Sequence, residues 1–562
     1  MDDNLKPRVF LEKIEFKNSD IGITLKKNEK VIIVGPNNSG KSQTLREILT
    51  IADQRKNTET LVIKDLAFNK NISNSDFTIF LQNNATYINP NFHYLDRKIH
   101  VNYVNKWDNN YLDGDLTELF IKNITAKERL DICQDQNSVS PDQPKTKAQH
   151  ILYDDDNLMQ NISSLFQKAF GKELMFDFKG GSKLPIHVGE IPRGEIFTDR
   201  QSNTYRDAVR KNPKLENQGD GVKSYAGILF ETLTNDRDII LLDEPEAFLH
   251  PPQMRKLGET LSSEHKGQMI VATHSSDIMR GFLEGTKGNI KILRIQRDGE
   301  KNIVYNADAD AIQELWKKPN LRFSNALDGM FHEQVIICED DSDCRLYNYT
   351  AEWLKNSRGD NWLDTSYVPS GGKSAIHGIA SVLRKVGVPV KAVFDIDFLS
   401  DEKLVTDTVQ AFGGVPAEIL PYWKRVDGYV RKGIKPKTNI EIKEAIRDLL
   451  DDSAEDELKK SAITACMKQG QSWSMLKLTG EAGLPGGDAY SEYRKLINHL
   501  KNIGIYIVPV GEIERFNKHI PGHGPKFVAT LLAEHSLESE DFDELKKFTE
   551  LVHKGPHSKL GE

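Results

Sequence analysis

The sequence predicts an α/β protein made of two successive parallel-sheet domains. Over residues 30–52, an apolar run leads into a glycine-rich loop and then into a segment with helical apolar spacing. A second alternation of apolar strands and amphipathic helices begins near residue 333. The 562 residues are enough for about two to four domains.

Composition and charge place the chain among globular proteins with a large polar surface. Hydrophobic residues make up 38% and charged residues 28%, and no apolar stretch is long enough to predict a membrane span. The start has no signal-peptide core, and the four cysteines show no C-x-x-C spacing. We therefore expect a cytoplasmic protein without a zinc site or a disulfide framework. The formal charge of −8 means that nucleic acid would have to bind local basic patches.

The first domain is expected over residues 1–330, with an irregular insertion over about 55–215. Apolar or alternating runs predict its strands, and helical apolar spacing predicts its helices. The expected strands and hairpin lie within 9–34, 77–82, 238–245, 268–275 and 290–306. The expected helices span 41–52, 157–170 and about 251–263, and residues 134–149 are predicted to form a flexible loop.

A second α/β domain is expected over residues 331–530, followed by a short helical tail over 531–562. Apolar runs predict strands over 335–339, 390–397 and 503–514, and a helix is predicted over 341–356. Residues 403–500 are highly charged and mostly helical in pattern, which indicates a helical insertion before the last strand.

A nucleotide site is predicted from the stretch Gly35-Pro-Asn-Asn-Ser-Gly40-Lys41-Ser42, which matches G-x-x-x-x-G-K-[ST]. The glycines let backbone N–H groups wrap a phosphate at the start of the helix. Lys41 would reach the β- and γ-phosphates of ATP, and the Ser42 hydroxyl would bind Mg²⁺. The expected ATP-binding residues of this loop are Gly35, Asn38, Gly40, Lys41 and Ser42.

A partner motif, I-I-L-L-D-E-P-E, follows over residues 239–246. Its four apolar residues predict a buried strand. Asp243 at the strand end would hold Mg²⁺, and Glu244 would polarise the attacking water. His274 ends another apolar strand and is suited to contact the γ-phosphate.

Carboxylates follow three apolar strands of the second domain. Asp395 and Asp397, separated by one residue, would share one face of a strand. Glu339 ends the predicted strand 335–339, and Asp343 follows four residues later. Glu512 and Glu514 lie at the end of the predicted strand 503–514. The expected metal ligands are therefore Glu339, Asp343, Asp395, Asp397, Glu512 and Glu514. Parallel strands bring such ends together, and the repulsion between the acids predicts bound Mg²⁺ or Mn²⁺. Two such ions can support phosphodiester cleavage.

These motifs resemble a known family. DEPEAFLHP resembles the corresponding stretch of ABC-type ATPases of the OLD (overcoming lysogenization defect) and RecF kind, and a strand-end Glu followed by D-x-D resembles the Toprim domain. Together and in this order they resemble OLD-family nucleases, an ABC-type ATPase head fused to a Toprim domain, similar to Gabija-type and retron-associated members. The resemblance covers roughly residues 8–50, 215–300, 333–400 and 503–530.

The resemblance implies further site residues. A signature loop would contact ATP on a second head, and its best match is the stretch 218–224, with Gly221; Gly219 stands where a serine is common, which bears on ATP turnover. Gln82, after the predicted strand 77–82, would be the Q-loop glutamine. Lys526, beyond the last acidic strand, would stabilise charge on the scissile phosphate. The glycines of V-P-S-G-G-K-S-A-I (368–376), with Lys373, could also approach a phosphate.

The resemblance also implies an inserted dimerisation segment in the ATPase half, DNA as substrate and a role in antiphage defence. Two basic stretches are candidates for DNA contact: Tyr422, Trp423, Lys424, Arg425, Arg431, Lys432, Lys435 and Lys437; and Arg193, Arg200, Arg206 and Arg210. Two alternatives to an ATP-regulated DNA endonuclease stay open. One is a RecF-like repair ATPase that binds DNA without cutting it. The other is an ATPase scaffold controlled by a partner nucleoprotein, such as a retron reverse transcriptase with its RNA–DNA.

Overall fold

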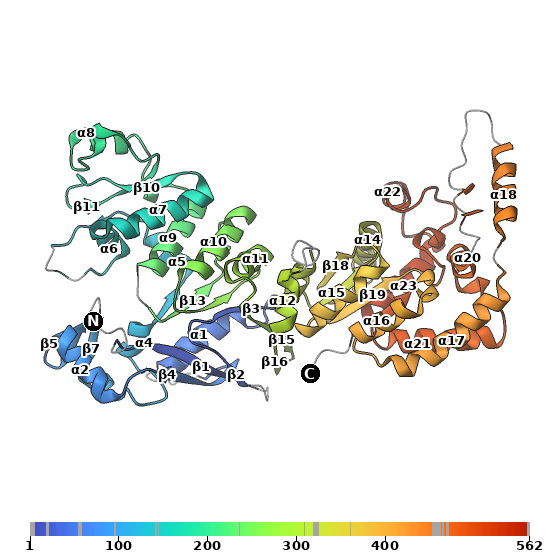
Figure 1. The fold of residues 1–562 in the computed structure, drawn as a ribbon, viewed down its shortest axis with the longest axis horizontal. Coiled ribbons are helices and arrows are strands. Elements are labelled where there is room, and N and C mark those ends of the chain that lie inside the picture. The colour runs from blue at the N-terminus through green and yellow to red at the C-terminus, as the bar shows by residue number, and fades with distance from the viewer. Residues whose placement is uncertain are drawn as a thin grey trace. The chain divides into compact units, whose positions relative to one another are not determined.

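The chain folds into two compact units, Met1–Arg322 and Phe323–Glu562, whose elements are labelled in Figure 1. The computed structural model describes residues 6–17, 22–53, 59–94, 97–140, 143, 145–234, 237–299, 301–307, 309–317, 325–359, 361–435, 437–451, 462–463, 466–467 and 471–558.

A six-stranded sheet forms the centre of the first unit. Its order is β16-β15-β3-β14-β13-β8, and neighbouring strands are parallel except β15 and β16, which form the expected hairpin. The strands are β3 (Lys30–Val34), β8 (Ile121–Ile124), β13 (Ile239–Asp243), β14 (Gln268–Ala272), β15 (Lys291–Asp298) and β16 (Lys301–Asn306). β3 and β14 are buried along their whole length, as expected for central strands of a parallel sheet.

A second, antiparallel sheet of order β2-β1-β4 is formed by β1 (Val9–Phe16), β2 (Gly22–Thr24) and β4 (Ile63–Lys70). Helix α1 (Lys41–Ala52) contributes Leu45 and Ile48 to a hydrophobic core shared with Leu11 of β1 and Ile33 of β3. The helix that follows the glycine-rich loop is therefore held by both sheets.

Further helices lie on the other side of the central sheet from α1 (Figure 1). They include α5 (Ala126–Asp131), α7 (Asp156–Phe170), α9 (Asp220–Leu233), α10 (Pro251–Glu264) and α11 (Ser276–Thr286), and α12 (Ala309–Lys317) follows the hairpin. Helices α10 and α11 approach closely because glycines face each other: a Cβ on Gly281 would lie 2.1 Å from the Arg255 carbonyl oxygen.

The segment 55–215 is not a single insertion, which departs from the prediction. Strand β4 completes the antiparallel sheet and β8 forms one edge of the central sheet. The other elements of the segment are α2 (Asn74–Asn84), β5 (Thr86–Ile88), β6 (Asn91–Tyr94), β7 (Arg97–His100), α3 (Val101–Val104), α4 (Asp115–Phe120), β9 (Gln136–Asn137), α6 (Ala148–Asp154), β10 (Glu173–Phe176), β11 (Lys183–Leu184), β12 (Ile186–Gly189) and α8 (Asn203–Val209).

The strand predicted over residues 77–82 is wrong. This stretch lies in α2, whose N-cap Ser73 accepts a hydrogen bond from the Asp76 N–H. Phe77 and Leu81, four positions apart, are the buried residues of the helix. The short apolar run FTIFL fits both periods, and a polar N-cap decided for the helix.

The second unit is built on a four-stranded parallel sheet of order β18-β17-β19-β20. Its strands are β17 (Gln334–Cys338), β18 (Thr365–Pro369), β19 (Val390–Phe394) and β20 (Ile505–Ile507). The helices around it are α14 (Asp341–Arg358), α15 (Lys373–Lys385), α22 (Pro525–Glu534) and α23 (Asp543–Lys554). Helices α14, α22 and α23 share one hydrophobic core with Ile336 and Tyr506 of the sheet.

Among the described residues, the α-helices between β19 and β20 are α16 (Glu402–Ala411), α17 (Pro416–Gly433), α18 (Asn439–Asp451), α20 (Ser472–Thr479) and α21 (Asp488–Lys501). Part of the predicted helical insertion, including 452–460, lies outside the described residues. The C-terminal tail packs on the sheet, because the Ser558 N–H donates to the Val390 carbonyl at 2.8 Å. Within the described ranges, each helix is too short or too polar to cross a membrane.

Candidate functional site

The glycine-rich loop connects the end of β3 to the start of α1. Gly35 has φ +143°, and a Cβ there would lie 2.1 Å from the Ile295 carbonyl oxygen, so only glycine fits. Gly40 has φ +97° and caps α1, and Asn38 has φ +61°. The loop thus has the strand–loop–helix context that a phosphate-binding loop needs.

Lys41 is buried inside this loop. Its ammonium donates to the carbonyl oxygens of Gly35, at 2.9 Å, and Pro36, at 2.7 Å. Burial lowers the pKa of Lys41 to about 8, against the opposing effect of Glu244. A phosphate held in the loop would give this buried ammonium the anionic partner that the backbone carbonyls replace only in part.

Ser42, in the first turn of α1, contacts Asp243 at the end of β13. The Ser42 hydroxyl donates to Oδ1 of Asp243 at 2.9 Å. Burial raises the pKa of Asp243, while the bond from Ser42 lowers it. The structure therefore brings together the two predicted ligands of the Mg²⁺ that accompanies ATP.

Glu244 and His274 face each other at the ends of β13 and β14. The His274 Nε2 lies 3.9 Å from Oε1 of the exposed Glu244, whose φ is +46°. Burial lowers the pKa of His274, which favours the neutral ring. The Glu246 carboxylate holds the two strand ends together, accepting from the Thr273 hydroxyl at 2.8 Å and from the His274 N–H at 2.6 Å.

Arg129 is a site residue that sequence reasoning missed. It is fully buried in α5, and its guanidinium donates to the backbone carbonyls of Glu244, at 2.9 Å, and Asp243, at 3.4 Å. Helix α5 is pressed against α9, where a Cβ on Gly227 would lie 1.9 Å from the Arg129 carbonyl oxygen. Arg129 thus fixes the backbone that carries Glu244. The local sequence indicates only the start of helix α5, through the capping box formed by Thr125 and Glu128, and not the role of Arg129.

No described contact joins Gln82 to the glycine-rich loop, and Gly221 was predicted to act on a second head. Gln82 is exposed on α2, and the strand expected to lead into it does not form. Gly221 lies in the first turn of α9, where a Cβ would approach the Phe248 carbonyl oxygen to 2.5 Å. A contact between Gly221 and ATP bound to a second head stays a prediction.

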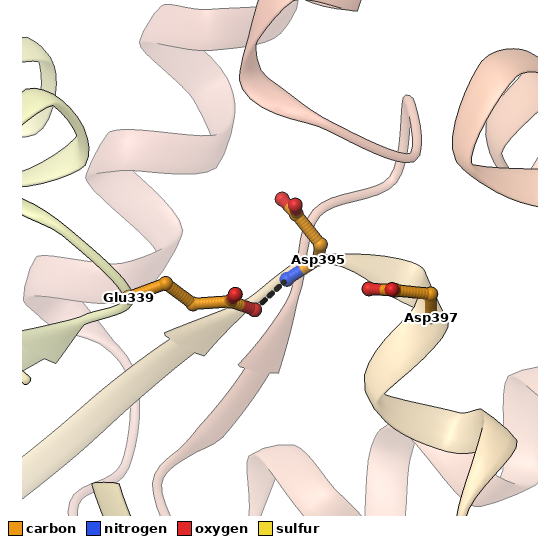
Figure 2. A group of neighbouring side chains, drawn as sticks. All are labelled: Glu339, Asp395 and Asp397. Carbon is orange, nitrogen blue, oxygen red and sulfur yellow. Dashed lines mark hydrogen bonds between the residues drawn. The ribbon is translucent and has the colours of Figure 1, made fainter. Parts of the chain in front are cut away.

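Three predicted metal ligands converge at the carboxyl edge of the second sheet. Glu339 follows β17, Asp395 follows β19, and Asp397 lies two residues further on (Figure 2). One carboxylate oxygen from each lies within 4.8 Å of the others. The Asp395 N–H donates to Oε1 of Glu339 at 3.3 Å, which ties the two strand ends together.

The expectation that Asp395 and Asp397 share one face of a strand is wrong. Strand β19 ends at Phe394, and Asp395 precedes the 3₁₀ helix η5 (Ile396–Ser400). The chain turns because the Ile396 N–H bonds to the Gly511 carbonyl at 3.0 Å. The two carboxylates meet through this turn, and Oδ1 of Asp397 is buried with no hydrogen-bond partner among the described residues.

The pKa values of two carboxylates in this cluster, Asp395 and Glu339, are raised. Burial raises the pKa of Asp395 well above its usual range, opposed by Lys477. Burial also raises the pKa of Glu339, and the nearby Asp397 adds to the effect. Such carboxylates ionise fully only when a cation neutralises them.

Two lysines point into the cluster. The Lys373 ammonium, at the start of α15, lies 2.7 Å from Oδ2 of Asp397. The Lys477 ammonium, from α20, lies 2.8 Å from Oδ2 of Asp395 and 3.7 Å from Oδ1 of Asp397. Burial lowers the pKa of Lys477, but Asp395 and Asp397 outweigh it and raise the pKa overall. Sequence reasoning named Lys373 as a phosphate contact and missed Lys477, because α20 lies in the segment predicted only as a charged helical insertion.

Asp343 and Glu514 form a second acidic pair beside Glu339. Asp343 caps α14 by accepting from the Asp340 N–H at 3.1 Å. Burial, then the charges of neighbouring acids, including Glu339 and Glu514, raise the pKa of Asp343 to about 7. Glu514 accepts from the Gly524 N–H at 2.6 Å. These two acids lie outside the three-carboxylate cluster but are electrostatically linked to it.

Glu512 is not in the cluster. The strand predicted to reach residue 514 ends at Ile507, so Glu512 lies in the turn before the 3₁₀ helix η7 (Ile513–Phe516). Its side chain is buried, with Oε1 3.5 Å from Nε of Arg515. Lys526 is exposed in the first turn of α22, next to the loop that holds Glu514.

Most of the basic residues proposed to contact DNA are paired within the protein. Trp423 is buried and donates to the Leu399 carbonyl at 2.9 Å, so it cannot stack on a base. The arginines of the first-unit stretch each bond to a carboxylate, in the pairs Arg193–Glu173, Arg200–Asp156, Arg206–Asp207 and Arg210–Asp177. In the second unit the pairs are Lys424–Glu402, Arg425–Glu492 and Arg431–Asp427, and the exposed lysines left are Lys432, Lys435 and Lys437.

Two family models match the chain. Residues 192–280 match the model described as "AAA domain, putative AbiEii toxin, Type IV TA system". Residues 330–397, which contain Glu339, Asp395 and Asp397, match "Overcoming lysogenization defect protein-like, TOPRIM domain". The chain joins an ATPase domain to an OLD-like Toprim domain. The predicted α/β class, with an ATPase unit followed by a Toprim unit, is confirmed.

Some of the solved structures that are similar to the chain are ATPase heads. A crystal structure of the SmcHead bound to the C-winged helix domain of ScpA shares 14% identity, covers 53% of this chain and 97% of its own, and has a TM-score of 0.34. The SMC head domain from Thermotoga maritima shares 13% identity over 53% of this chain and 99% of its own, with a TM-score of 0.29. A nucleotide-free ATP-binding cassette from an ABC transporter shares 12% identity, covers 56% of this chain and 97% of its own, and has a TM-score of 0.25. Scores this low add nothing to the argument. No curated protein matches the chain.

Proposed function

We propose that the protein is an ATP-regulated, divalent-metal-dependent DNA endonuclease that cuts phosphodiester bonds at the Toprim unit. One observation carries this proposal: three carboxylates from two segments, Glu339 after β17 and Asp395 with Asp397 after β19, converge within 4.8 Å, although burial and mutual repulsion disfavour their charged forms. A protein keeps such an arrangement where a cation binds.

The residues fit Mg²⁺ or Mn²⁺. Glu339, Asp395 and Asp397 offer only hard oxygen ligands, and the buried Oδ1 of Asp397 lacks a hydrogen-bond partner among the described residues. Asp343 and Glu514 supply a neighbouring pair of carboxylates for a second ion. These carboxylates would hold the divalent ions, whose chemistry when bound would be activation of a water and stabilisation of charge on the leaving oxygen.

The protein's own groups would bind and orient the DNA backbone. Gly371 and Gly372, with φ +78° and +125°, leave open space in front of the N-terminus of α15. A helix N-terminus preceded by exposed glycines is a phosphate-binding arrangement. Lys373 begins this helix, and the exposed Lys526 supplies a further cation near Glu514.

ATP would act at the first unit. Lys41 and the glycine-rich loop bind the phosphates, Ser42 and Asp243 hold Mg²⁺, and Glu244 with His274 positions the attacking water. We propose that two ATP-bound heads pair, as a homodimer or larger homo-oligomer, and that this pairing controls the Toprim site.

Plasmid nicking tests the proposal. Wild-type protein is incubated with supercoiled plasmid and Mg²⁺ or Mn²⁺, with and without ATP, beside an Asp395→Ala/Asp397→Ala variant. We expect metal-dependent nicking that the variant loses by at least roughly 100-fold, because several kcal/mol of charge stabilisation disappear. Asp448→Ala, an exposed acid of α18, is the matched control and should cut normally. Failure of the wild type under every condition would refute the endonuclease, and normal cutting by the double variant would refute the site.

The binding-only alternatives leave the acidic cluster without a use. Neither a RecF-like ATPase nor a scaffold needs a buried carboxylate oxygen without a hydrogen-bond partner at a sheet edge. A role in antiphage defence, and a partner such as a retron reverse transcriptase with its RNA–DNA, stay predictions that rest on the family resemblance.

A further inference from the structure

The helical insertion delivers a lysine into the acidic cluster. The Lys477 ammonium lies between the two aspartates, 2.8 Å from Oδ2 of Asp395 and 3.7 Å from Oδ1 of Asp397. It faces the same Asp397 oxygen that has no hydrogen-bond partner among the described residues. The ammonium thus occupies the position of a counterion in the group of carboxylates proposed to hold the metal.

The backbone around Lys477 is built to hold it there. A Cβ on Gly511 would lie 2.5 Å from the Lys477 carbonyl oxygen, and a Cβ on Gly480 would lie 2.4 Å from the Pro509 carbonyl oxygen. Glycine at both positions lets the end of α20 touch the loop after β20. The Glu481 N–H bonds to Pro509 at 2.8 Å, so the contact is also hydrogen-bonded.

The same loop positions the aspartates. The Gly511 carbonyl accepts from the Ile396 N–H at 3.0 Å, and Ile396 lies between Asp395 and Asp397. At its other end, α20 is anchored by the buried Trp473, which donates to Oδ1 of Asp427 at 2.9 Å. The helix is therefore fixed at both ends relative to the acids.

The ion pair between Lys477 and Asp395 is less exposed than the surface ion pair between Lys495 and Glu492 of the same insertion. The side chains of Lys477 and Asp395 are 20% and 19% exposed, whereas Lys495, paired with Glu492, is 53% exposed. Partly buried charges interact more strongly than exposed ones because water screens them less. Lys477 therefore contributes, together with Lys373, to the charge balance of the cluster.

We propose that Lys477 is a further residue of the Toprim site, with two partners in turn. Before metal binds, its ammonium pairs with Asp395 and, together with Lys373, offsets the charge of Asp397. When a divalent cation binds these carboxylates, Lys477 swings away on its flexible stem and contacts the scissile phosphate. This inference rests on the proposed nuclease function, and it makes the helical insertion a part of the site.

Electrostatics explains why Lys477 would exchange the two aspartates for a phosphate when a metal ion binds. A divalent cation bound by Asp395 and Asp397 would repel an ammonium that touches the same oxygens. The four-carbon stem of lysine allows the ammonium to move without a movement of the helix. DNA phosphate at the metal is the next anion within its reach, and a cation there would stabilise the charge that develops during cleavage.

Lys477→Met tests the inference, with Lys495→Met as the matched control. Three quantities are measured: the Mn²⁺ dissociation constant by calorimetry, the melting temperature in EDTA, and plasmid nicking at saturating Mn²⁺. We expect Lys477→Met to tighten Mn²⁺ binding at least about threefold, because a competing cation is gone. It should also melt earlier in EDTA and recover its melting temperature with Mn²⁺. Nicking should fall at least about tenfold.

Each result decides one step. Unchanged or weaker Mn²⁺ binding overturns the exchange, and unchanged nicking overturns the phosphate contact. A merely structural lysine would weaken metal binding and nicking together. Gly480→Ala, which keeps the lysine but displaces the end of α20, should also slow nicking; normal nicking would overturn the positioning by this helix. If the wild type itself does not cut, the proposed function fails, while calorimetry and melting still test the exchange.

Discussion

The Ser42 hydroxyl donates a hydrogen bond of 2.9 Å to Oδ1 of Asp243, so the first residues of α1 and the end of β13 are joined directly. The two residues are 201 positions apart in the sequence, and they meet because β14 lies between β13 and β3 in the sheet. Together with the buried Lys41, they are the residues proposed to receive Mg²⁺ and the phosphates of ATP.

Removing either member of this pair should weaken the Mg²⁺-dependent binding of ATP. For Ser42→Ala and Asp243→Asn we expect ATP affinity in the presence of Mg²⁺ to fall at least about tenfold, and affinity in EDTA to change much less. Calorimetric titration with ATP, with and without Mg²⁺, measures both. Ser263→Ala, an exposed hydroxyl of α10, is the control. Equal losses with and without Mg²⁺ would show that the pair acts on the fold and not on the metal.

Arg129→Met should separate ATP turnover from ATP binding. The guanidinium holds the Glu244 carbonyl at 2.9 Å and does not approach the glycine-rich loop by any described contact. Without it, Glu244 loses its fixed position, and we expect the ATPase rate to fall about tenfold with ATP affinity changed less than about threefold. Steady-state hydrolysis and calorimetry measure the two quantities. Arg345→Met, an exposed arginine of α14, is the control; parallel losses of rate and affinity would contradict the assignment.

The ATPase site was largely predictable because its residues lie in two short motifs with a fixed local geometry. The glycines of the loop, Lys41, Ser42 and Asp243 depend on strand–loop–helix structure that the sequence shows directly. Arg129 depends on tertiary packing of α5 against α9, for which a single sequence carries no signal. Gln82 was misplaced because a five-residue apolar run does not distinguish a strand from a helix.

The Toprim site was predictable in its composition and not in its details. Strand ends at one sheet edge had to bring Glu339 and Asp395 together, and they do. The 3₁₀ turn that brings in Asp397 and the early end of β20 that leaves Glu512 aside depend on long-range backbone bonds to Gly511 and its neighbours. Lys477 reaches the site only because glycines let two distant segments touch.

Arg210 should contribute to stability and not to DNA binding. Its Nε lies 2.7 Å from Oδ2 of Asp177, a carboxylate that is only 3% exposed. Arg210→Ala leaves that buried charge without its main partner, and we expect a loss of roughly 1–3 kcal/mol in the free energy of unfolding. DNA affinity, measured by fluorescence anisotropy, should stay within about twofold. Lys432→Ala, an exposed lysine of α17, is the comparison. A marked loss of DNA affinity in Arg210→Ala alone would restore the first-unit stretch as a DNA contact.

His553 should make the Toprim unit sensitive to acid. The ring is buried in α23 and hydrogen-bonded to the Tyr367 hydroxyl, and burial, with the nearby Lys391, lowers the pKa of His553 to about 3. An unfolded histidine has a pKa near 6.5, so the unfolded state binds more protons between these values. The free energy of unfolding should therefore fall as the pH drops through this window, with an upper limit of roughly 5 kcal/mol for this group.

His553→Gln removes the titrating ring, so its free energy of unfolding should depend less on pH than that of the wild type between about pH 6.5 and pH 4. Denaturant unfolding at several pH values measures the difference. Lys391, whose pKa burial lowers to about 7, is present in both proteins and loses its proton mainly above this window. His519→Gln, an exposed histidine, should follow the wild-type curve. Parallel curves for the wild type and His553→Gln would mean that the ring is already charged, or open to water, in the folded state.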